Sequence, residues 1–135
     1  ALDQASVHPV VAPYLESWRG WRAESLVEIV ASECEVTHAA LGYVGHPDRG
    51  VRFPGSDRLF IIDIKTGVHA AWHAIQAALY ALAWQSTHGG PTPMRGGVYL
   101  HESGRPGTYV AFRETRDFDV AKAVCAVAHW RKEHQ

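Results

Sequence analysis

The sequence predicts an α/β fold in which a central mixed β-sheet is flanked by helices, and three observations lead to it. A short apolar run rich in β-branched residues, Leu59 to Ile62, is typical of a buried strand. An alanine-rich segment without internal glycine or proline, Ala70 to Gln85, predicts a long helix shortly after that strand. Strand-like runs also precede and follow this pair. We therefore expect one sheet with helices packed on it.

Two further elements precede the central strand. Between Pro9 and Arg22, apolar and aromatic residues recur at helical spacing, which predicts an amphipathic helix whose aromatic face lies in the core. The segment from Leu26 to His38 is rich in valine and isoleucine, and it predicts one strand or a pair of strands. Pro54 to Asp57 is typical of a hairpin turn leading into the central strand.

The last third of the chain completes the expected sheet. Gly97 to His101 and Thr108 to Phe112 predict two more strands, which extend the sheet. Phe118 to Arg131 predicts a closing helix, and Asp117 can cap its N-terminus. We expect this helix to pack on the sheet through a narrow apolar stripe. The stripe consists of Val120, Val124 and Val127.

Composition places limits on the class of protein. The 135 residues suit a single domain, residues 1–135, with one core, and 47% hydrophobic with 20% charged residues is usual for such a domain. No apolar run approaches the ~20 residues of a membrane span, and Ala1 to Ser6 is too short and mixed for a signal peptide. We therefore expect a cytoplasmic protein with no membrane partner. Cys34 and Cys125 are expected to be reduced thiols, with a disulfide as the alternative, and they are too few for an iron–sulfur cluster.

Charged residues follow the central strand directly. Because strand side chains alternate, Asp63 and Lys65 point the same way while Ile64 faces the core. A carboxylate there can hold a hard divalent cation. The lysine can orient water or neutralise a phosphate oxygen as an ammonium, or deprotonate water as a neutral amine. The hairpin turn brings Asp48 to the same place as a second carboxylate. An Asp-x-Lys triplet alone is common by chance, but Lys65 is one of only three lysines in the chain.

Other polar residues can join this group. Glu33 and Glu35 share one face of a strand if the strand continues through them, so either can face the site or be a solvated residue. Gln76 and Tyr80 lie at i and i+4 on the alanine-rich helix, where an amide and a phenol can bind phosphate or orient carboxylates. His46, beside Asp48, can contact a phosphate or a water on a metal, although a surface role is the alternative.

Two weaker patterns complete the set. His69 and His73 have metal-ligand spacing but lack a third partner, so they are a poor zinc signal. Gly42 and Gly45 would let the backbone approach another strand or a substrate closely.

The formal net charge of −1 is unusual for a nucleic-acid-binding domain, which is generally basic. Ten of the thirteen cations, however, are arginines, which suit bidentate phosphate contacts. Five of them are expected in or beside the site and its loops. They are Arg49, Arg52, Arg58, Arg95 and Arg105.

Three motifs in order resemble the PD-(D/E)XK nuclease superfamily, in its RecB-like and phage-type exonuclease branch. They are Gly45-His46-Pro47-Asp48-Arg49, Asp63-Ile64-Lys65-Thr66-Gly67 and Gln76-Ala77-Ala78-Leu79-Tyr80. They match G-x-x-D-R, D-x-K-T-G and Q-x-x-x-Y, and the resemblance runs from about Pro9 to the end of the chain. Three linked motifs are far more specific than any one. The resemblance implies a restriction-endonuclease-like core and a hydrolase of DNA phosphodiester bonds, in this branch an exonuclease on linear DNA.

The resemblance also implies roles for individual residues. Asp48, Asp63, the Ile64 carbonyl and an upstream acid would hold one or two Mg²⁺ or Mn²⁺ ions. The Glu-x-x-Val pattern favours Glu33 over Glu35 as that acid. Lys65 would act on the attacking water. Substrate binding or support of the site would come from Gln76, Tyr80, Arg49, His46 and Thr66.

Rival functions remain open at this level. The alternatives are a non-catalytic DNA-binding or regulatory module that keeps the fold, an endonuclease or resolvase of the same superfamily, and a small metalloenzyme acting on a nucleotide or another phosphoester. Neither the polarity of cleavage nor the strand preference follows from these residues, and a homo-oligomer is possible.

Overall fold

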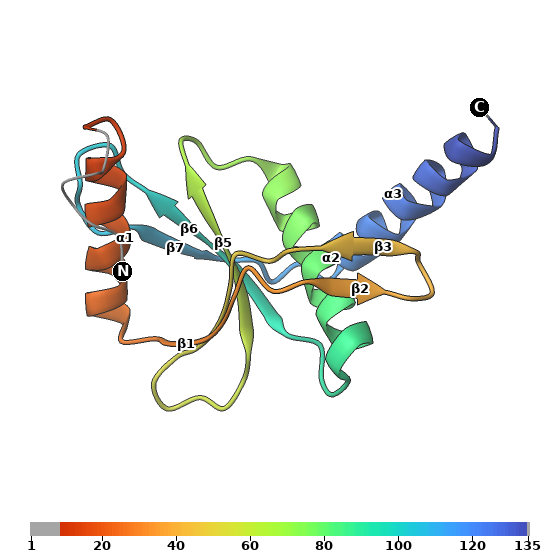
Figure 1. Ribbon diagram of the computed structural model, residues 1–135, viewed down its shortest axis with the longest axis horizontal. Helices are drawn as coiled ribbons and strands as arrows, with labels where there is room; N and C mark the ends of the chain where they lie inside the picture. The colour runs from red at the N-terminus through yellow and green to blue at the C-terminus, as the bar shows by residue number, and fades with distance from the viewer. Residues whose placement is uncertain (1–8, 135) are drawn as a thin grey trace.

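The fold is organised on a five-stranded sheet with the strand order β1-β4-β5-β6-β7, beside which β2 and β3 form a separate hairpin (Figure 1). A computed structural model describes residues 9–134, so Ala1 to Ser6, where no signal peptide is expected, lies outside the described residues. The elements are α1 (Ala12–Ser25), β1 (Glu28–Ser32), β2 (Val36–His38), β3 (Tyr43–Gly45), β4 (Arg49–Arg52), β5 (Phe60–Thr66), α2 (Ala71–His88), β6 (Met94–Leu100), β7 (Thr108–Ala111) and α3 (Arg116–Glu133).

The sheet is mixed, which confirms the α/β prediction. β4 and β5 form an antiparallel hairpin around the predicted turn, in which the Ser56 N–H donates to the Phe53 carbonyl at 3.1 Å. β5 and β6 run parallel, as a strand–helix–strand connection through α2 requires. β1 and β7 add antiparallel edges. Along residues 9–134, no helix is both long and apolar enough to cross a membrane.

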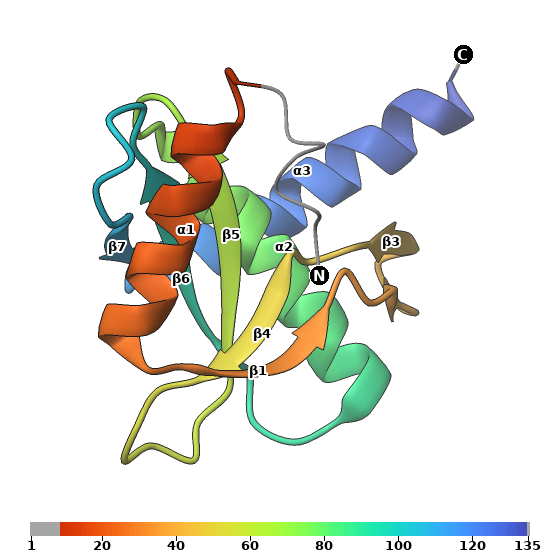
Figure 2. The same cartoon turned by 60° about the vertical axis from the view of Figure 1, so that its left-hand side comes forward.

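Helices cover opposite faces of the sheet, with α1 in front of it and α2 behind it in Figure 2. Trp21 of α1 is buried against Val51, Ile62 and Val98, and it stacks on Trp18 with ring centroids 5.5 Å apart. The aromatic face of the first helix is therefore core, as predicted. On the other side, α2 presents fully buried alanines, which allow the helix axis to approach the strands closely.

The β2–β3 hairpin is anchored on α2. The Tyr43 hydroxyl donates to the Leu79 carbonyl at 2.6 Å, and the Thr37 N–H donates to Thr87 Oγ1 at 2.8 Å. Gly45 makes the contact possible, because a Cβ atom at that position would lie 2.9 Å from the Tyr80 ring. A close approach at Gly45 was predicted toward another strand or a substrate; the structure shows one toward the Tyr80 ring on α2, and it brings the first motif onto the helix that carries the third.

One expectation about the strands is wrong. The segment from Leu26 to His38 does divide into two strands, but they belong to different sheets. Glu33 and Glu35 lie in the turn between them, and Glu33 has a left-handed backbone with φ of 49°. The two glutamates therefore do not share one face of a strand, because the chain leaves β1 at Ser32.

The expected packing of the last helix is also wrong. α3 packs on α2 through the buried Ala121 and Cys125, and its C-terminal end projects beyond the other elements (Figure 1). His129, in its C-terminal half, contacts the Leu41 carbonyl in the β2–β3 turn. The stripe of Val120, Val124 and Val127 remains 45%, 49% and 57% exposed. The helix uses its small residues for contact, because alanine and cysteine let two helices approach more closely than valine does.

Asp117 does not cap α3 but holds a buried arginine. Arg95 is 4% exposed, and its Nη1 donates to Asp117 Oδ2 at 3.0 Å. The same guanidinium donates to the carbonyls of Ala74 and Glu114. The expectation that Arg95 lies in or beside the site is wrong. The arginine is buried at the junction of sheet and helices, and its guanidinium donates to Asp117 and to two backbone carbonyls instead. Cys34 and Cys125 are free thiols, as predicted.

The exposed valine stripe leads to a direct test. We expect Val124→Ser to change the unfolding free energy by less than ~0.5 kcal/mol, because substitutions at exposed positions remove little packing. The same change at the fully buried Val51 should lower it by ~2 kcal/mol or more, since a cavity and a buried hydroxyl are both introduced. Urea unfolding of the two variants measures this difference. Equal losses would show that α3 packs through its valines after all.

Candidate active site

Asp48 and Asp63 come together where β4 begins and β5 runs past it. The hairpin register pairs Arg49 with Ile62, so the residue before β4 is brought opposite Asp63. Asp48 Oδ2 accepts a hydrogen bond from the Ile64 N–H at 2.7 Å. In an extended strand the N–H and C=O of one residue point to the same side, so the Ile64 carbonyl also faces this edge. Two carboxylates and one backbone carbonyl therefore converge.

Asp63 is the most perturbed carboxyl group of the site. It is 3% exposed, and its pKa is raised from 3.8 to about 6, first by burial and then by the neighbouring Asp48 charge and hydrogen bonding. Lys65, whose Nζ lies 3.3 Å from Asp63 Oδ2, opposes part of this rise. No donor among the described residues forms a hydrogen bond to that oxygen, although it is buried. A buried carboxylate oxygen without a donor calls for a ligand.

Lys65 is held from three sides. Its side chain is 17% exposed, and its Nζ donates to Gln76 Oε1 at 2.6 Å while contacting Asp63. The ammonium also lies 4.9 Å from the centroid of the Trp72 ring, a cation–π distance. Ile64 packs on the core between Asp63 and Lys65, which confirms that these two charged side chains point the same way. The lysine is therefore oriented before any substrate binds.

The predicted pair on α2 forms a second layer around the charges. Gln76 Nε2 donates to the Tyr80 hydroxyl at 3.2 Å, so the two share a helix face as expected. Burial raises the pKa of Tyr80, and the charges of Asp63 and Asp48 raise it further. Tyr80 is consequently a neutral phenol close to both carboxylates. One Gln side chain thus connects the phenol to the lysine.

Sequence reasoning missed three residues next to the lysine. Trp72 carried no signal beyond its helical spacing, yet it is 58% exposed beside Lys65. Tyr99 lies opposite Lys65 in the β5–β6 register, and its hydroxyl is 2.8 Å from His73 Nδ1. Burial lowers the pKa of His73, and the charges of Lys65 and His69 add to this effect. His73 is buried against Tyr99, which its i, i+4 spacing from His69 could not have indicated.

The remaining expected residues lie further out. Glu33 is exposed in the β1–β2 turn, and its N–H donates to the Asp48 carbonyl at 3.0 Å. Glu35 and His46 are both exposed, with Glu35 Oε2 3.8 Å from His46 Nε2. Across residues 9–134, no three metal-binding side chains gather, so neither glutamate is grouped with the two aspartates.

The side chains of two further motif residues, Arg49 and Thr66, lie apart from the two carboxylates. Arg49 Nη1 donates to the Asp48 carbonyl at 2.7 Å, and its guanidinium lies 5.7 Å from the Trp18 ring on the α1 side of the sheet. Arg49 thereby supports the backbone that presents Asp48. Thr66 ends β5 and is exposed.

The converging oxygens suit a hard divalent cation. Carboxylate and carbonyl oxygens are the ligands that Mg²⁺ and Mn²⁺ prefer. The buried Asp63 oxygen has no hydrogen-bond donor, and the two aspartates destabilise each other's charge. A cation bound at Asp48, Asp63 and the Ile64 carbonyl would satisfy the oxygen and relieve the repulsion. The residues present therefore fit such an ion.

The raised pKa of Asp63 predicts how stability depends on pH. Without metal, the folded protein keeps a proton on this carboxyl group up to about pH 6, whereas the unfolded chain releases it near 3.8. The unfolding free energy should therefore decrease as the pH rises from ~4 to ~6, by up to about 3 kcal/mol. Asp63→Asn should remove this decrease, while Asp119→Asn on exposed α3 should keep it. Urea unfolding in EDTA across this range measures the effect.

Comparison with known proteins agrees with this geometry. The family model described as the PD-(D/E)XK nuclease superfamily matches residues 2–132, which is nearly the whole chain. Among curated proteins no match is found. The matched region contains both aspartates, Lys65 and the Gln76–Tyr80 pair in one continuous site. The chain belongs to the PD-(D/E)XK nuclease superfamily.

Proposed function

We propose that this chain is a Mg²⁺- or Mn²⁺-dependent nuclease that hydrolyses phosphodiester bonds in DNA. The observation that carries the proposal is the Asp48–Asp63 pair, in which the buried Asp63 Oδ2 accepts no hydrogen bond from the described residues and lies 3.3 Å from the Lys65 ammonium. A protein that only bound DNA would gain nothing from placing the buried Asp63 beside a second carboxylate that repels it and beside an oriented ammonium. Membership of the superfamily supports the same reaction class.

Binding of one or two ions would involve Asp48, Asp63 and the Ile64 carbonyl. A divalent cation there supplies Lewis acidity, which makes water more acidic and offsets charge on the scissile phosphate. Glu33 is the proposed additional acid. Support for it comes from its backbone hydrogen bond to the Asp48 carbonyl, which places it in the neighbouring turn, and from its exposed side chain.

Lys65 is the proposed residue acting on the nucleophile. Its ammonium lies 3.3 Å from Asp63 and is fixed by Gln76, so it points to the same region as the carboxylates. An ammonium in that position orients the attacking water by hydrogen bonding and stabilises negative charge that develops on the phosphate oxygens. The Trp72 ring, 4.9 Å from the ammonium, adds a third contact that favours this orientation.

Gln76 and Tyr80 have a positioning role in this scheme. Gln76 accepts from Lys65 and donates to Tyr80, so a change in one is transmitted to the other. The neutral Tyr80 phenol can donate a hydrogen bond to a carboxylate or to a phosphate oxygen. His46, Arg49 and Thr66 remain proposed contacts to substrate or site, and Arg49 already supports the Asp48 backbone.

Within the superfamily we favour an exonuclease of the RecB-like and phage-type branch acting on linear DNA. Support comes from the three motifs, because the structure gives the third one a physical connection to the second through the Gln76–Lys65 hydrogen bond. An endonuclease or resolvase would use the same carboxylates and lysine. The requirement for a free DNA end therefore distinguishes an exonuclease from these two activities.

Metal dependence and end dependence can be measured together. We expect Mg²⁺ or Mn²⁺ to support degradation of 5′- or 3′-labelled linear DNA, with release of label in small products. Ca²⁺ should bind without supporting efficient cleavage, because its coordination is looser. A closed circle of the same sequence should persist. Cleavage of the circle would establish an endonuclease, whereas full activity in excess EDTA would exclude the metal mechanism.

A further inference from the structure

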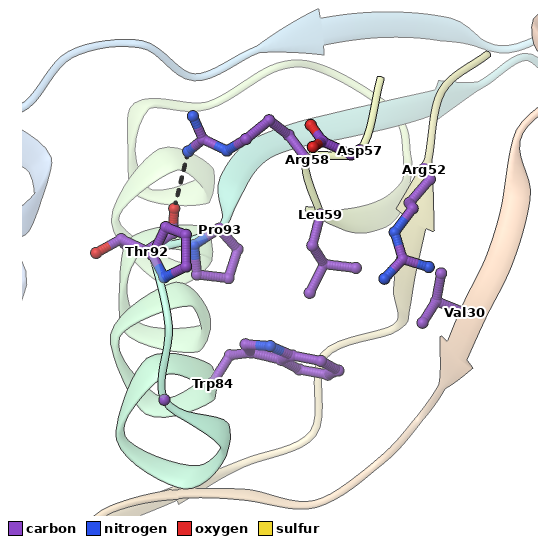
Figure 3. Close-up of a pocket in the computed structure, with 10 residues that line it drawn as sticks. Val30, Arg52, Asp57, Arg58, Leu59, Trp84, Thr92 and Pro93 are labelled. Carbon is purple, nitrogen blue, oxygen red and sulfur yellow. Dashed lines mark hydrogen bonds between the residues drawn. The ribbon is translucent and has the colours of Figure 1, made fainter. Parts of the chain in front are cut away.

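A pocket of about 230 Å³ lies at the opposite end of β5 from Asp63 and Lys65 (Figure 3). It is formed where the β4–β5 hairpin meets the end of α2 and the loop leading to β6. The residues that matter for its chemistry are Arg52, Asp57, Arg58, Leu59, Trp84 and Thr92. Small-molecule sites usually enclose about 300 Å³ or more, so this pocket has room for one small unit of a larger ligand.

Two arginines and one carboxylate line the pocket, which leaves it with a net positive charge. The Arg52 guanidinium forms no hydrogen bond and no ion pair with the described residues, and Figure 3 shows it pointing into the pocket. Glu28 lies opposite Arg52 in the β1–β4 register, yet it forms no ion pair with the guanidinium. Arg58 donates to the Thr92 carbonyl at 3.2 Å and keeps its other donors available. Asp57 is the one carboxylate that lines the pocket.

A flat aromatic ring lies across from the arginine. Figure 3 shows the Trp84 indole facing Leu59 and the end of Arg52 across the pocket. The ring of His88 packs against the indole with centroids 4.2 Å apart, which holds the indole in place. A guanidinium that lacks a partner binds phosphate well, and an indole stacks with nucleobases. The combination fits a group with an anionic part and a planar part.

The same helix leads from this pocket to the catalytic residues. Gln76, Tyr80 and Trp84 are each four residues apart on α2, so they lie on one face of the helix. Two helical turns, about 12 Å along the axis, separate Gln76 from Trp84. A DNA strand with its scissile phosphate at Asp48 and Asp63 would reach the pocket within a few nucleotides.

We propose that this pocket binds one nucleotide, with its phosphate on Arg52, its base against Trp84 and Arg58 adding positive charge at the rim. The nucleotide belongs to the DNA strand whose scissile bond lies in the catalytic site. This form of the proposal rests on the proposed nuclease function. A free nucleoside monophosphate has the same chemistry, and the experiment separates the two sources.

The test measures binding instead of cleavage. Fluorescein-labelled oligodeoxythymidylates of two, four, eight and twelve nucleotides are titrated with the Asp63→Asn protein, with and without a second substitution, and followed by anisotropy. Arg52→Ala should weaken binding of the longer strands by about 10-fold. It should also reduce the slope of log K against the logarithm of the salt concentration by about one. The dinucleotide should bind unchanged. Trp84→Leu should weaken the longer strands by a similar factor.

Controls keep the outcomes separate. Arg22→Ala removes one exposed arginine from α1, on the other face of the sheet, and should leave all affinities unchanged. Melting temperatures show whether each variant is folded, and Arg52→Ala and Arg58→Ala carry the test if Trp84→Leu unfolds. Saturable binding of thymidine monophosphate to the wild-type chain that is lost in Arg52→Ala, with strands unaffected, would identify a free nucleotide as the ligand of the same pocket.

The pocket and the nuclease function can fail independently. If Arg52→Ala, Arg58→Ala and Trp84→Leu bind every strand and the mononucleotide as Arg22→Ala does, the pocket proposal is overturned even when the protein degrades DNA. If DNA is never cleaved but the affinity for long strands still depends on Arg52, the pocket proposal is supported and the proposed nuclease function is wrong. Inorganic phosphate binding as tightly as the mononucleotide would overturn the base contact with Trp84.

Discussion

Asp63→Asn is expected to lower DNA cleavage at low Mg²⁺ by ~10³-fold or more, because a bound cation contributes several kcal/mol of transition-state stabilisation. The asparagine keeps the shape of the side chain but removes one of the two charges that would bind the ion. Mg²⁺ affinity, measured by calorimetry, should fall together with the single-turnover cleavage rate. High Mg²⁺ concentrations should restore part of the rate, since the loss is mainly one of metal binding.

The matched control for this variant is Asp119→Asn. Asp119 is an exposed aspartate in the first turn of α3, and it has no contact with the site. The control should cleave DNA and bind Mg²⁺ as the wild type does. If Asp63→Asn cleaved DNA at the wild-type rate at low Mg²⁺, the two-aspartate metal site would have to be abandoned.

Lys65→Ala is expected to separate binding from chemistry. Mg²⁺ and DNA should still bind, because the carboxylates remain, whereas the single-turnover rate should fall by ~10²-fold or more, the usual scale for a positioned acid–base group. Removing the ammonium also removes the hydrogen bond to Gln76 and the ion pair that lowers the Asp63 pKa. Mg²⁺ affinity should consequently depend more steeply on pH near 6 in the variant than in the wild type.

A second lysine serves as the control here. Lys122 is exposed on α3, so Lys122→Ala removes the same charge from the chain without altering the site. Its cleavage rate and DNA affinity should match the wild type. A Lys65→Ala protein that cleaves DNA at nearly the wild-type rate would remove the lysine from the mechanism and leave it as a structural partner of Asp63.

The sequence by itself determined the elements that local patterns specify. Alternation along a strand is a property of the backbone, so the common direction of Asp63 and Lys65 followed from their spacing alone. The i, i+4 relation of Gln76 and Tyr80 follows from helix geometry in the same way. The hairpin turn at Pro54 to Asp57 was also predictable, because proline and glycine restrict the chain locally. The order of the three motifs added the likeness to a nuclease family.

Only the tertiary structure decided which faces of the elements meet. α3 has an apolar stripe of valines, but the helix packs on α2 through Ala121 and Cys125, whose small side chains let the two helices approach closely. Periodicity cannot reveal this, since it describes one helix and not its partner. The sequence predicted Arg95 in or beside the site, but the Asp117 carboxylate from a distant element allows it to be buried elsewhere.

The same limit applies to the site. Trp72 and Tyr99 lie beside Lys65 because α2 and β6 pack on β5, and no local pattern connects these three residues. The left-handed turn at Glu33 separates two strands that the sequence could present as one, and this turn decides where the upstream acids lie. Local spacing thus determined which side chains leave a strand or helix together. Contacts between segments distant in the sequence decided which of them share a site.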